Sequence, residues 1–600
     1  MDKKNKEKEK SGAEHIVWDL TDLYKSPEDE QLKKDKQALL ESAKTFSDTY
    51  RSRVAELGAS EFFDAMTAYE NIIEQAHKIG AYSHLAWSVN TEDPALGKLL
   101  QEASELGSEV SQILVFFDVE WLKIEEEQAS ELINSDELKK WKHYLETSRR
   151  YKEHTLSEDA EKVMSAKSVT GRSAWNRYFD ETIGAARFEF EGEKLPEQEV
   201  LSKLHSADRD IRKKAHTSLT AGFQNHARSL TYIFNTILAD KYTNDRLRKY
   251  ENWIDSRNLA NQTDRQSVNA LIDAVTGKYH LVQRYYNLKK NLLGYDELFD
   301  YDRYAPLAKT SKTITWLEAK DIVLESFGEF HPKMAETAAK FFDNNWIDAA
   351  IKPGKRGGAY SASTVTSVHP YVFMNYDGQL RDVQTLAHEL GHGVHQYAAR
   401  IQGELQSSTP LTTAETASVF GEMLVFSKLM NNLEDDKEKL ALLISKIDDT
   451  IATVFRQISM NRFEDKIHTA RRELGELTTE QYSELWFETQ HALYGDSVKL
   501  TDEYKLWWCY IPHFLHTPGY VYAYAFGELL VLALFDAYKN SAIENFEDKY
   551  LALLEAGGSD WPHNLIGMLN MDIKHPEFWG NGLSLFESMI TDAEKLAASI

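Results

Sequence analysis

The chain has 600 residues, of which 42% are hydrophobic and 12% aromatic, so it can bury a large core and is not a disordered protein. Its formal net charge of −26 argues against a nucleic-acid partner, because phosphates would be repelled. Only 12 prolines and 29 glycines interrupt it, which favours long helices over a sandwich or barrel with many turns.

Cysteine content and hydropathy point to a compartment. The single cysteine, Cys509, can form no intramolecular disulfide and suits a reducing environment. The charged N-terminus is not followed by an apolar signal core, and the longest apolar runs, such as residues 529–535, are too short to span a bilayer. We therefore expect a cytoplasmic protein without a membrane partner. Its oligomeric state is left open, with a monomer included.

The first third of the chain reads as a helical domain. Residues 1–10 are predicted to be a charged flexible tail. Apolar residues then recur at spacings of three and four, and Ser157 before two acidic residues indicates a helix start. Alternating residues from 187 to 190, followed by a turn at Gly192, predict a short hairpin. We place one domain at 11–195 and a second, larger domain at 196–600.

The second domain returns to helical periodicity after a few interruptions. Residues 302–312 are predicted to form a loop, and Thr315 with Glu318 matches a capping box. Residues 352–358 are rich in glycine and look flexible. Residues 372–376 are predicted to be a strand that ends in a turn at Asp377-Gly378. The next predicted helix, 381–400, carries the most informative pattern in the chain.

That pattern is His388-Glu389-x-x-His392. In a helix the two histidines lie one turn apart on one face, where they could bind one zinc ion, and Glu389 could act as a base on a water molecule. Gly391 and Gly393 lie inside the same helix, where each costs about 1 kcal/mol relative to alanine. We therefore expect another backbone or a substrate to approach closely. The alternative is an ordinary amphipathic helix with core histidines.

A catalytic zinc needs a third protein ligand and one open position. A third histidine at metzincin spacing is excluded, because His395 and Ala398 occupy the positions that need glycine and histidine. Glu415 and Glu422, seven residues apart on a predicted helix from residue 412, are the other candidates. Glu415 also fits a capping box with Thr412. For His395 a packing or supporting role is favoured over a fourth ligand, which would close the site.

Four segments together resemble the oligoendopeptidase F family of thimet-oligopeptidase-like zinc peptidases: residues 355–360, 375–378, 386–395 and 414–422. The resemblance implies a mainly α, two-domain zincin-type peptidase. It also implies a small β element beside the active-site helix and a deep central channel. One zinc ion is expected, held by His388, His392 and Glu415, and the domain at 196–600 is expected to be catalytic.

The segment from His513 to Gly527 contains three tyrosines at alternate positions. By composition alone it is an aromatic core stripe. The resemblance implies that His516 and Tyr524 stabilise the charge that develops on the cleaved carbonyl, and that Tyr520 contacts the substrate. Gly527 occupies a place where thimet oligopeptidase has a tyrosine, which leaves more of this role to Tyr524.

Two upstream features have candidate roles in substrate binding. The strand at 372–376 could pair with an extended substrate, and Gly357 and Gly358 could let their loop close over it. The alternatives are a plain hairpin and a surface loop.

We expect a zinc endopeptidase that cleaves internal bonds of short unstructured oligopeptides, using metal-activated water and Glu389 as general base. The other interpretations are a metal-dependent carboxypeptidase of the same architecture and a non-catalytic peptide-binding protein.

Overall fold

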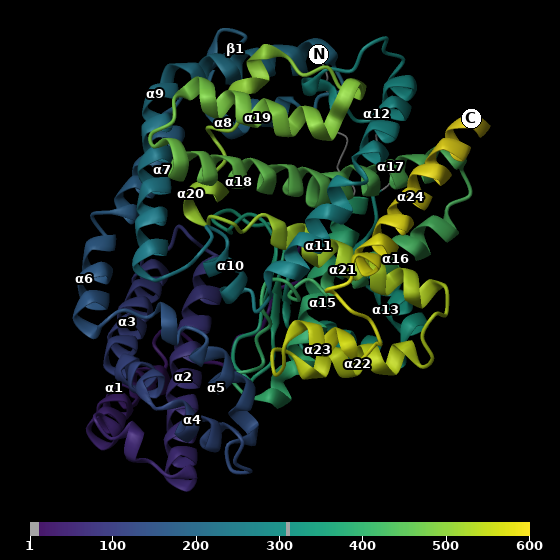
Figure 1. Cartoon of the computed structure of the whole chain (residues 1–600). Helices are drawn as coiled ribbons and strands as arrows, with labels where there is room; N and C mark the ends of the chain where they lie inside the picture. The colour runs from purple at the N-terminus through teal and green to yellow at the C-terminus, as the bar shows by residue number, and fades with distance from the viewer. Residues whose placement is uncertain (1–10, 308–312) are drawn as a thin grey trace. The chain divides into compact units, whose positions relative to one another are not determined.

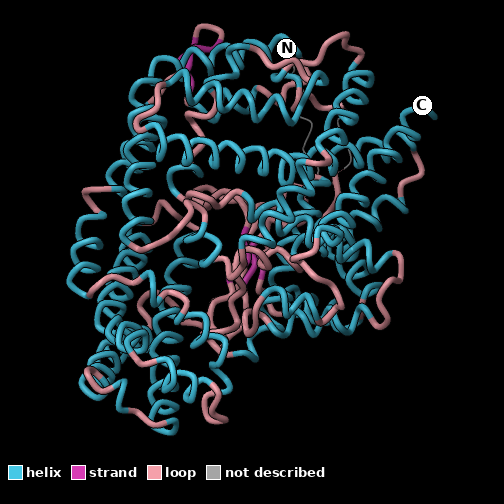
Figure 2. Tube along the Cα trace, viewed as in Figure 1, coloured by secondary structure: helices cyan, strands magenta, loops and turns pink. Residues whose placement is uncertain are grey.

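The computed structural model describes residues 11–307 and 313–600, so the predicted tail at 1–10 and the end of the predicted loop at 302–312 lie outside the described residues. Helices make up most of the described chain, and the few strands are short, as Figure 2 shows. The predicted mainly α fold is confirmed. No helix in these two ranges is long and apolar enough to cross a membrane.

The chain forms two compact units, each assembled from three separated stretches. The first unit comprises residues 11–152, 313–432 and 537–571, and the second comprises 153–307, 433–536 and 572–600. The domains expected from the sequence, at 11–195 and 196–600, are continuous stretches and do not coincide with these two units. As functional domains they stay a prediction. Each unit is described by itself below.

The first unit contains two groups of helices and the small sheet. Its elements, which can be followed by colour in Figure 1, are α1 (Glu30–Tyr50), α2 (Ala59–Ser88), α3 (Pro94–Lys123), α4 (Glu126–Ile133), α5 (Lys142–Arg149), α13 (Trp316–Phe330), α14 (Pro332–Asp343), β3 (Ile347–Asp348), β4 (Tyr360–Ala362), β5 (Tyr371–Phe373), α15 (Leu380–Ala399), α16 (Ser418–Asn432), α22 (Phe546–Ala556) and α23 (Pro562–Gly567). Helices α1, α2 and α3 pack on one another, and α15 packs on α16.

The second unit is built around its longest helix, α9. Its elements are α6 (Glu158–Ser168), α7 (Arg172–Ala185), β1 (Phe188–Phe190), β2 (Glu193–Leu195), α8 (Glu197–Lys203), α9 (Arg209–Leu247), α10 (Asp255–Ala260), α11 (Arg265–Thr276), α12 (Tyr279–Leu293), α17 (Asp436–Thr450), α18 (Arg456–Leu474), α19 (Thr479–Tyr494), α20 (His513–His516) and α24 (Pro576–Ser599). Helix α21 (Tyr522–Lys539) begins in this unit and ends in the first. The core of the second unit joins α9, α18 and α19 through large side chains that include Phe234, Trp486 and Phe514.

Local sequence signals set several element ends as expected. The Ser157 hydroxyl accepts a hydrogen bond from the Ala160 amide and begins α6, and Thr315 forms the expected capping box with Glu318 at α13. The predicted hairpin is present as β1 and β2, paired antiparallel. These features depend on residues close together in the sequence, so they can be predicted without knowledge of the tertiary fold.

The small sheet of the first unit has the strand order β3-β5-β4. Strand β5 pairs with β3 in parallel, with Ile347 opposite Val372, and with β4 antiparallel, with Tyr360 opposite Phe373. The predicted strand at 372–376 is therefore the central strand of this sheet. Because both of its edges are already hydrogen-bonded, the prediction that it pairs with a substrate was wrong. The edge strand nearest the 381–400 helix is β4, which contacts α15.

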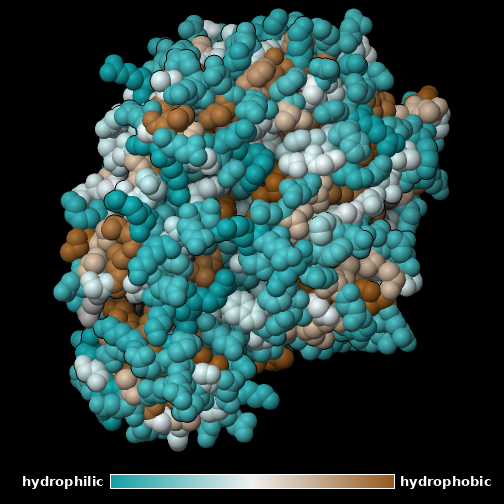
Figure 3. All heavy atoms as spheres, viewed as in Figure 1, coloured by the Kyte–Doolittle hydropathy of each residue, from teal (hydrophilic) through white to brown (hydrophobic). Residues whose placement is uncertain are grey.

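Charged and polar residues dominate the face in Figure 3, where hydrophobic residues are scattered in small groups. This hydrophilic surface agrees with a chain in which 27% of the residues are charged.

Candidate metal centre

Helix α15 presents two histidines on one face. A carboxylate at its start fixes the entry of the chain, because Asp382 accepts hydrogen bonds from the amides of Asp377 and Gln379 at 2.9 and 3.0 Å. One turn separates His388 from His392, and their ring centroids are 4.8 Å apart. Both side chains are only partly buried.

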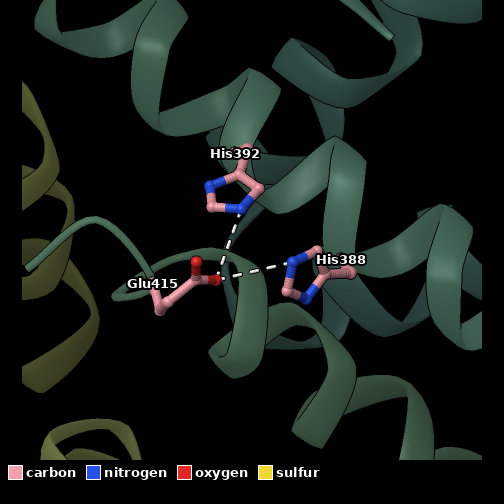
Figure 4. A group of neighbouring side chains, drawn as sticks. All are labelled: His388, His392 and Glu415. Atoms are coloured by element: carbon pink, nitrogen blue, oxygen red, sulfur yellow. Dashed lines mark ion pairs between the residues drawn. The ribbon is translucent and has the colours of Figure 1, made fainter. Parts of the chain in front are cut away.

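A carboxylate completes the group. In Figure 4 the Glu415 side chain points between the two rings, and its Oε2 lies 3.4 Å from Nε2 of His388 and 3.3 Å from Nε2 of His392. One ligand atom from each of the three residues lies within 4.8 Å of the others. Two imidazoles and one carboxylate are a donor set typical of a catalytic metal that keeps one open position. The three residues therefore fit a metal ion.

The segment that carries Glu415 differs from the expected helix. Residues 411–417 form turns, and α16 begins only at Ser418. Glu415 is thus not the capping-box partner in a helix that begins near Thr412. Its Oε2 accepts a hydrogen bond from the Ser418 hydroxyl at 2.5 Å. Burial would raise the pKa of Glu415, but the hydrogen bond to His392 and the charges of both histidines outweigh it and lower this pKa to about 2.

The two glycines in α15 make room for different neighbours. A Cβ atom on Gly391 would lie 2.4 Å from the carbonyl oxygen of Ala417 and 2.7 Å from Cα of Ser418, so only glycine lets this backbone come so near α15. The expected close approach of another backbone is confirmed at Gly391. A Cβ atom on Gly393 would instead meet the ring of Phe341 on α14, at 2.6 Å.

Glu422 lies on the other side of His388. Its Oε1 accepts a hydrogen bond from Nδ1 of His388 at 2.5 Å, on the ring nitrogen remote from Glu415. Burial lowers the pKa of His388, but this bond and the surrounding carboxylates outweigh burial and raise it to about 9. Glu415 and Glu422 therefore contact different nitrogens of the same imidazole. His395 is buried, which lowers its pKa to about 4.

Glu389 lines the cavity beside this group. Its side chain is 6% exposed, and burial raises the pKa of its carboxyl group. The cavity has a volume of about 500 Å³ and is also lined by β4 and by residues 363–366 and 407–409. Ser361 of β4 donates a hydrogen bond to Gln396 of α15 at 2.8 Å, which holds the edge strand against the helix.

Gly357 and Gly358 lie in the exposed connection that leads into β4. Asn375 donates hydrogen bonds to the carbonyls of Arg356 and Gly358, both at 3.0 Å. The buried Lys355 forms an ion pair with Asp348 at 2.6 Å. The connection is therefore tied to the sheet next to these two glycines, and neither glycine lines the cavity.

The second unit contains the predicted aromatic residues. Tyr520 precedes α21 and Tyr524 lies in its first turn, with ring centroids 4.9 Å apart. Nε2 of His513 lies 3.2 Å from the Tyr524 hydroxyl, whereas the exposed His516 lies 2.9 Å from Asp180. The structure thus brings His513, and not His516, to the tyrosine pair. Sequence reasoning missed His513 because the two histidines are the first and last residues of the same four-residue helix, α20.

The chain is similar to known proteins over most of its length. The sequence model of peptidase family M3 matches residues 202–585, and that of a family described as Oligopeptidase F matches residues 120–188. Oligopeptidase PepF of Bacillus subtilis is 28% identical over 594 residues, which cover 97% of this chain and 88% of that protein. The oligoendopeptidase F homolog of Lactococcus lactis is 26% identical over 604 residues, which cover 97% of this chain and 98% of that protein.

A solved structure supports the fold. The crystal structure of oligoendopeptidase-F from Enterococcus faecium has a TM-score of 0.72 and 23% identity, and the match covers 95% of this chain and 99% of that one. Because the first family match spans residues 202–585, well over half of the chain, the protein belongs to peptidase family M3 and is a metalloendopeptidase.

Proposed function

We propose that this protein is a zinc-dependent endopeptidase that hydrolyses internal peptide bonds of short, unstructured oligopeptides. The observation that carries the proposal is the convergence of His388, His392 and Glu415 on one point beside a cavity of about 500 Å³. These residues would hold the ion. Zinc bound there would supply Lewis acidity, which polarises a substrate carbonyl and makes water easier to deprotonate.

Glu389 is the proposed general base. It lines the same cavity and follows His388 directly on α15, so it stands beside the proposed ligands without being one of them. It would take a proton from the attacking water and give it to the leaving amine. Burial supports both steps, because a carboxyl group with a raised pKa is a better base and a better proton donor near neutral pH.

Glu422 is a proposed positioning residue. By accepting the Nδ1 proton of His388, it would fix the tautomer in which Nε2 carries the lone pair, and it would hold the ring in the plane that a ligand requires.

The edge strand β4 is the proposed binding element for the substrate backbone. It borders the cavity through Tyr360 and Ser361, and only one of its edges is paired within the sheet of the first unit. An extended peptide that adds to such an edge is held by main-chain hydrogen bonds, which tolerate many side chains. β4 would thus pair with the extended substrate in place of the strand at 372–376. Gly357 and Gly358, just before β4, stay predicted substrate contacts.

The aromatic segment around Tyr524 is proposed to supply charge stabilisation. Tyr524 stays the leading candidate, and its contact with His513 supports a hydroxyl held in a fixed orientation. Tyr520 packs on Tyr524 and stays a candidate substrate contact. His516 stays a prediction, and its neighbour in the structure is Asp180. The cytoplasmic location also stays a prediction.

Mass spectrometry of the products from a mixed peptide library, with and without a chelator, tests the function. We expect cleavage at internal bonds, lost with the chelator and restored by zinc. Blocked C-termini separate the two enzyme classes, because a carboxypeptidase would lose its substrates and an endopeptidase would still cut inside them. The names of the relatives, oligopeptidase and oligoendopeptidase, support short peptides as substrates.

A further inference from the structure

The first unit has a second cavity, which is lined by α2 and α3, two helices that lie side by side in Figure 1. It has a volume of about 820 Å³, and residues 361–364, which begin within β4, form its third side. We call it the α2–α3 groove. Four of its residues also line the cavity of the proposed metal centre: His77, Ser361, Ser363 and Thr364. The groove therefore adjoins that cavity, and all of these residues belong to the first unit.

Small residues keep the α2–α3 groove open. Those on its wall include Ala76, Gly80, Ala103, Ser104 and Gly107. A Cβ atom on Gly80 or on Gly107 would meet no atom within 4 Å. A glycine inside a helix costs about 1 kcal/mol relative to alanine, and neither of these two glycines allows a close contact in return. Their effect is to leave space for another molecule.

One carboxylate forms part of the groove wall. Asp118 of α3 is partly buried, and its hydrogen-bond partners are the hydroxyl groups of Tyr69 on α2, at 3.4 Å, and of Tyr144 on α5. It forms no ion pair with a cation of the described residues. Burial raises the pKa of Asp118 to about 6, although the hydrogen bonds from both tyrosines lower it. The group is therefore mainly ionised at neutral pH, and a partly buried carboxylate without a cation is costly.

Other groups on the wall do not balance this charge. No lysine or arginine of the described residues lines the groove. Nδ1 of His77 lies 2.7 Å from a carboxylate oxygen of Glu404, and Nε2 of His84 lies 3.2 Å from Nη1 of Arg356. Burial and the charge of Arg356 lower the pKa of His84, so this ring is mainly neutral at pH 7. The negative charge of Asp118 is thus open to a cation from outside the chain.

We propose that the α2–α3 groove binds a lysine or arginine side chain of the substrate, which Asp118 selects by its charge. The apolar stem of such a side chain suits the small wall residues, and its cationic head would form a charge-assisted hydrogen bond with the carboxylate. Ser361 of β4 lines both cavities, so a peptide paired with this edge strand can place one residue at the metal centre and another in the groove. The inference rests on the proposed function and names a preference among its substrates.

Matched peptides test the inference. N-acetylated, C-terminally amidated decapeptides of neutral residues carry one lysine, moved through every position, or norleucine, which keeps the four-carbon stem and lacks the ammonium group. Mass spectrometry of digests by the zinc-loaded enzyme gives kcat/KM and the cleaved bond. We expect lysine to raise kcat/KM over norleucine by about tenfold or more when it lies at one fixed distance from the cleaved bond, as for other charge-assisted hydrogen bonds.

Three variants locate the source of this preference. Asp118→Asn keeps the size of the side chain and removes its charge, so the preference should fall to about threefold or less. Gly107→Leu fills the open space without touching the carboxylate and should reduce the preference in the same way. Glu109→Gln removes an exposed charge from α3 outside the groove and should leave the preference unchanged. An unchanged preference in folded Asp118→Asn, or an equal loss in Glu109→Gln, would overturn the inference.

The pH profile gives a readout that a purely structural role would not change. In the ratio of kcat/KM for lysine and norleucine peptides, contributions from the metal centre cancel. Protonation of Asp118 removes its charge, so the ratio should fall as the pH is lowered from 7 to 5, through its pKa of about 6. The other titratable groups that face the groove, Tyr69, Tyr144, His77 and His84, remain in Asp118→Asn, and there the ratio should not vary with pH. An equal fall in both proteins would overturn the role of Asp118.

Two further comparisons separate the possible outcomes. A norleucine peptide with a free N-terminus tests the α-amino group as the cation, and a gain for this peptide with none for any lysine peptide would overturn the inference. Equal rates for all peptides would also overturn it while leaving the endopeptidase intact. If no peptide is cleaved, the proposed function fails. Calorimetry with the zinc-loaded protein would then still support the groove if the lysine peptide binds more tightly than the norleucine peptide and this difference is lost in Asp118→Asn.

Discussion

Replacing Gly391 with alanine would press on the segment that carries Glu415. The new Cβ atom would lie 2.4 Å from the Ala417 carbonyl oxygen, whereas ordinary contact begins at 3.4 Å, so the Ala417–Ser418 backbone would have to retreat by 3.4 − 2.4 = 1.0 Å. Metal sites hold their ligand distances to within about 0.2 Å. A shift of this size two residues from Glu415 should therefore disturb the metal site more than the fold.

The expected change in unfolding free energy agrees with a larger effect on the metal site than on the fold. Alanine gains about 1 kcal/mol of helix propensity over glycine, which offsets part of an overpacking cost of about 1–3 kcal/mol. We expect the metal-free Gly391→Ala protein to lose at most about 2 kcal/mol of unfolding free energy. Its zinc affinity should fall by about tenfold to a hundredfold, the range typical of changes that displace supporting groups of a metal site.

Gly393→Ala is the matched control, two residues away on the same helix. Its Cβ atom would meet the ring of Phe341 at 2.6 Å, so the strain falls on α14 and not on the Glu415 segment. We expect lower stability with zinc affinity within about threefold of wild type. Competition with a chromophoric chelator measures the affinity, and thermal unfolding of the metal-free proteins measures stability. The reasoning is refuted if Gly391→Ala binds zinc as tightly as wild type, or if both variants lose affinity equally.

Three further predictions follow from other contacts. Glu422→Ala should retain zinc but bind it about tenfold to a hundredfold more weakly, measured by the same competition, whereas full loss would make Glu422 a ligand. Lys355→Met leaves Asp348 buried without its cation, so chemical denaturation should show a loss of about 3–5 kcal/mol, partly recovered by adding Asp348→Asn; no loss would contradict the role of this pair. Burial raises the pKa of Glu464 to about 8, so the folded state keeps a proton that the unfolded chain releases above its ordinary pKa of 4.5. Wild-type stability should therefore fall from pH 5 to 8 relative to Glu464→Gln, and a constant difference in Tm would refute this.

Local patterns predicted the parts of the fold that depend on neighbouring residues. The helix of His388 and His392, the cap at Ser157 and the hairpin near Gly192 all follow from spacings of two to four residues. The third metal ligand was harder to predict, because seven-residue spacing places Glu415 and Glu422 on one face of any continuous helix. The turns at 411–417 break that helix and send the two carboxylates to different nitrogens of His388.

Features that depend on distant partners could not be predicted. The position of β5 in the middle of its sheet depends on pairing with β3 and β4, strands of two and three residues that are too short to show an alternating pattern. The choice between His513 and His516 depends on how the short helix α20 is oriented, which no periodicity reveals over four residues.

The central claim is that Glu389 acts as the base beside an ion held by His388, His392 and Glu415. Glu389→Gln keeps the shape of the side chain and removes its basicity. We expect this variant to bind one zinc ion per chain by elemental analysis and to cleave a fluorogenic oligopeptide about 10² to 10⁴ times more slowly than wild type. Zinc-loaded Glu389→Gln that turns over at the wild-type rate would contradict the account.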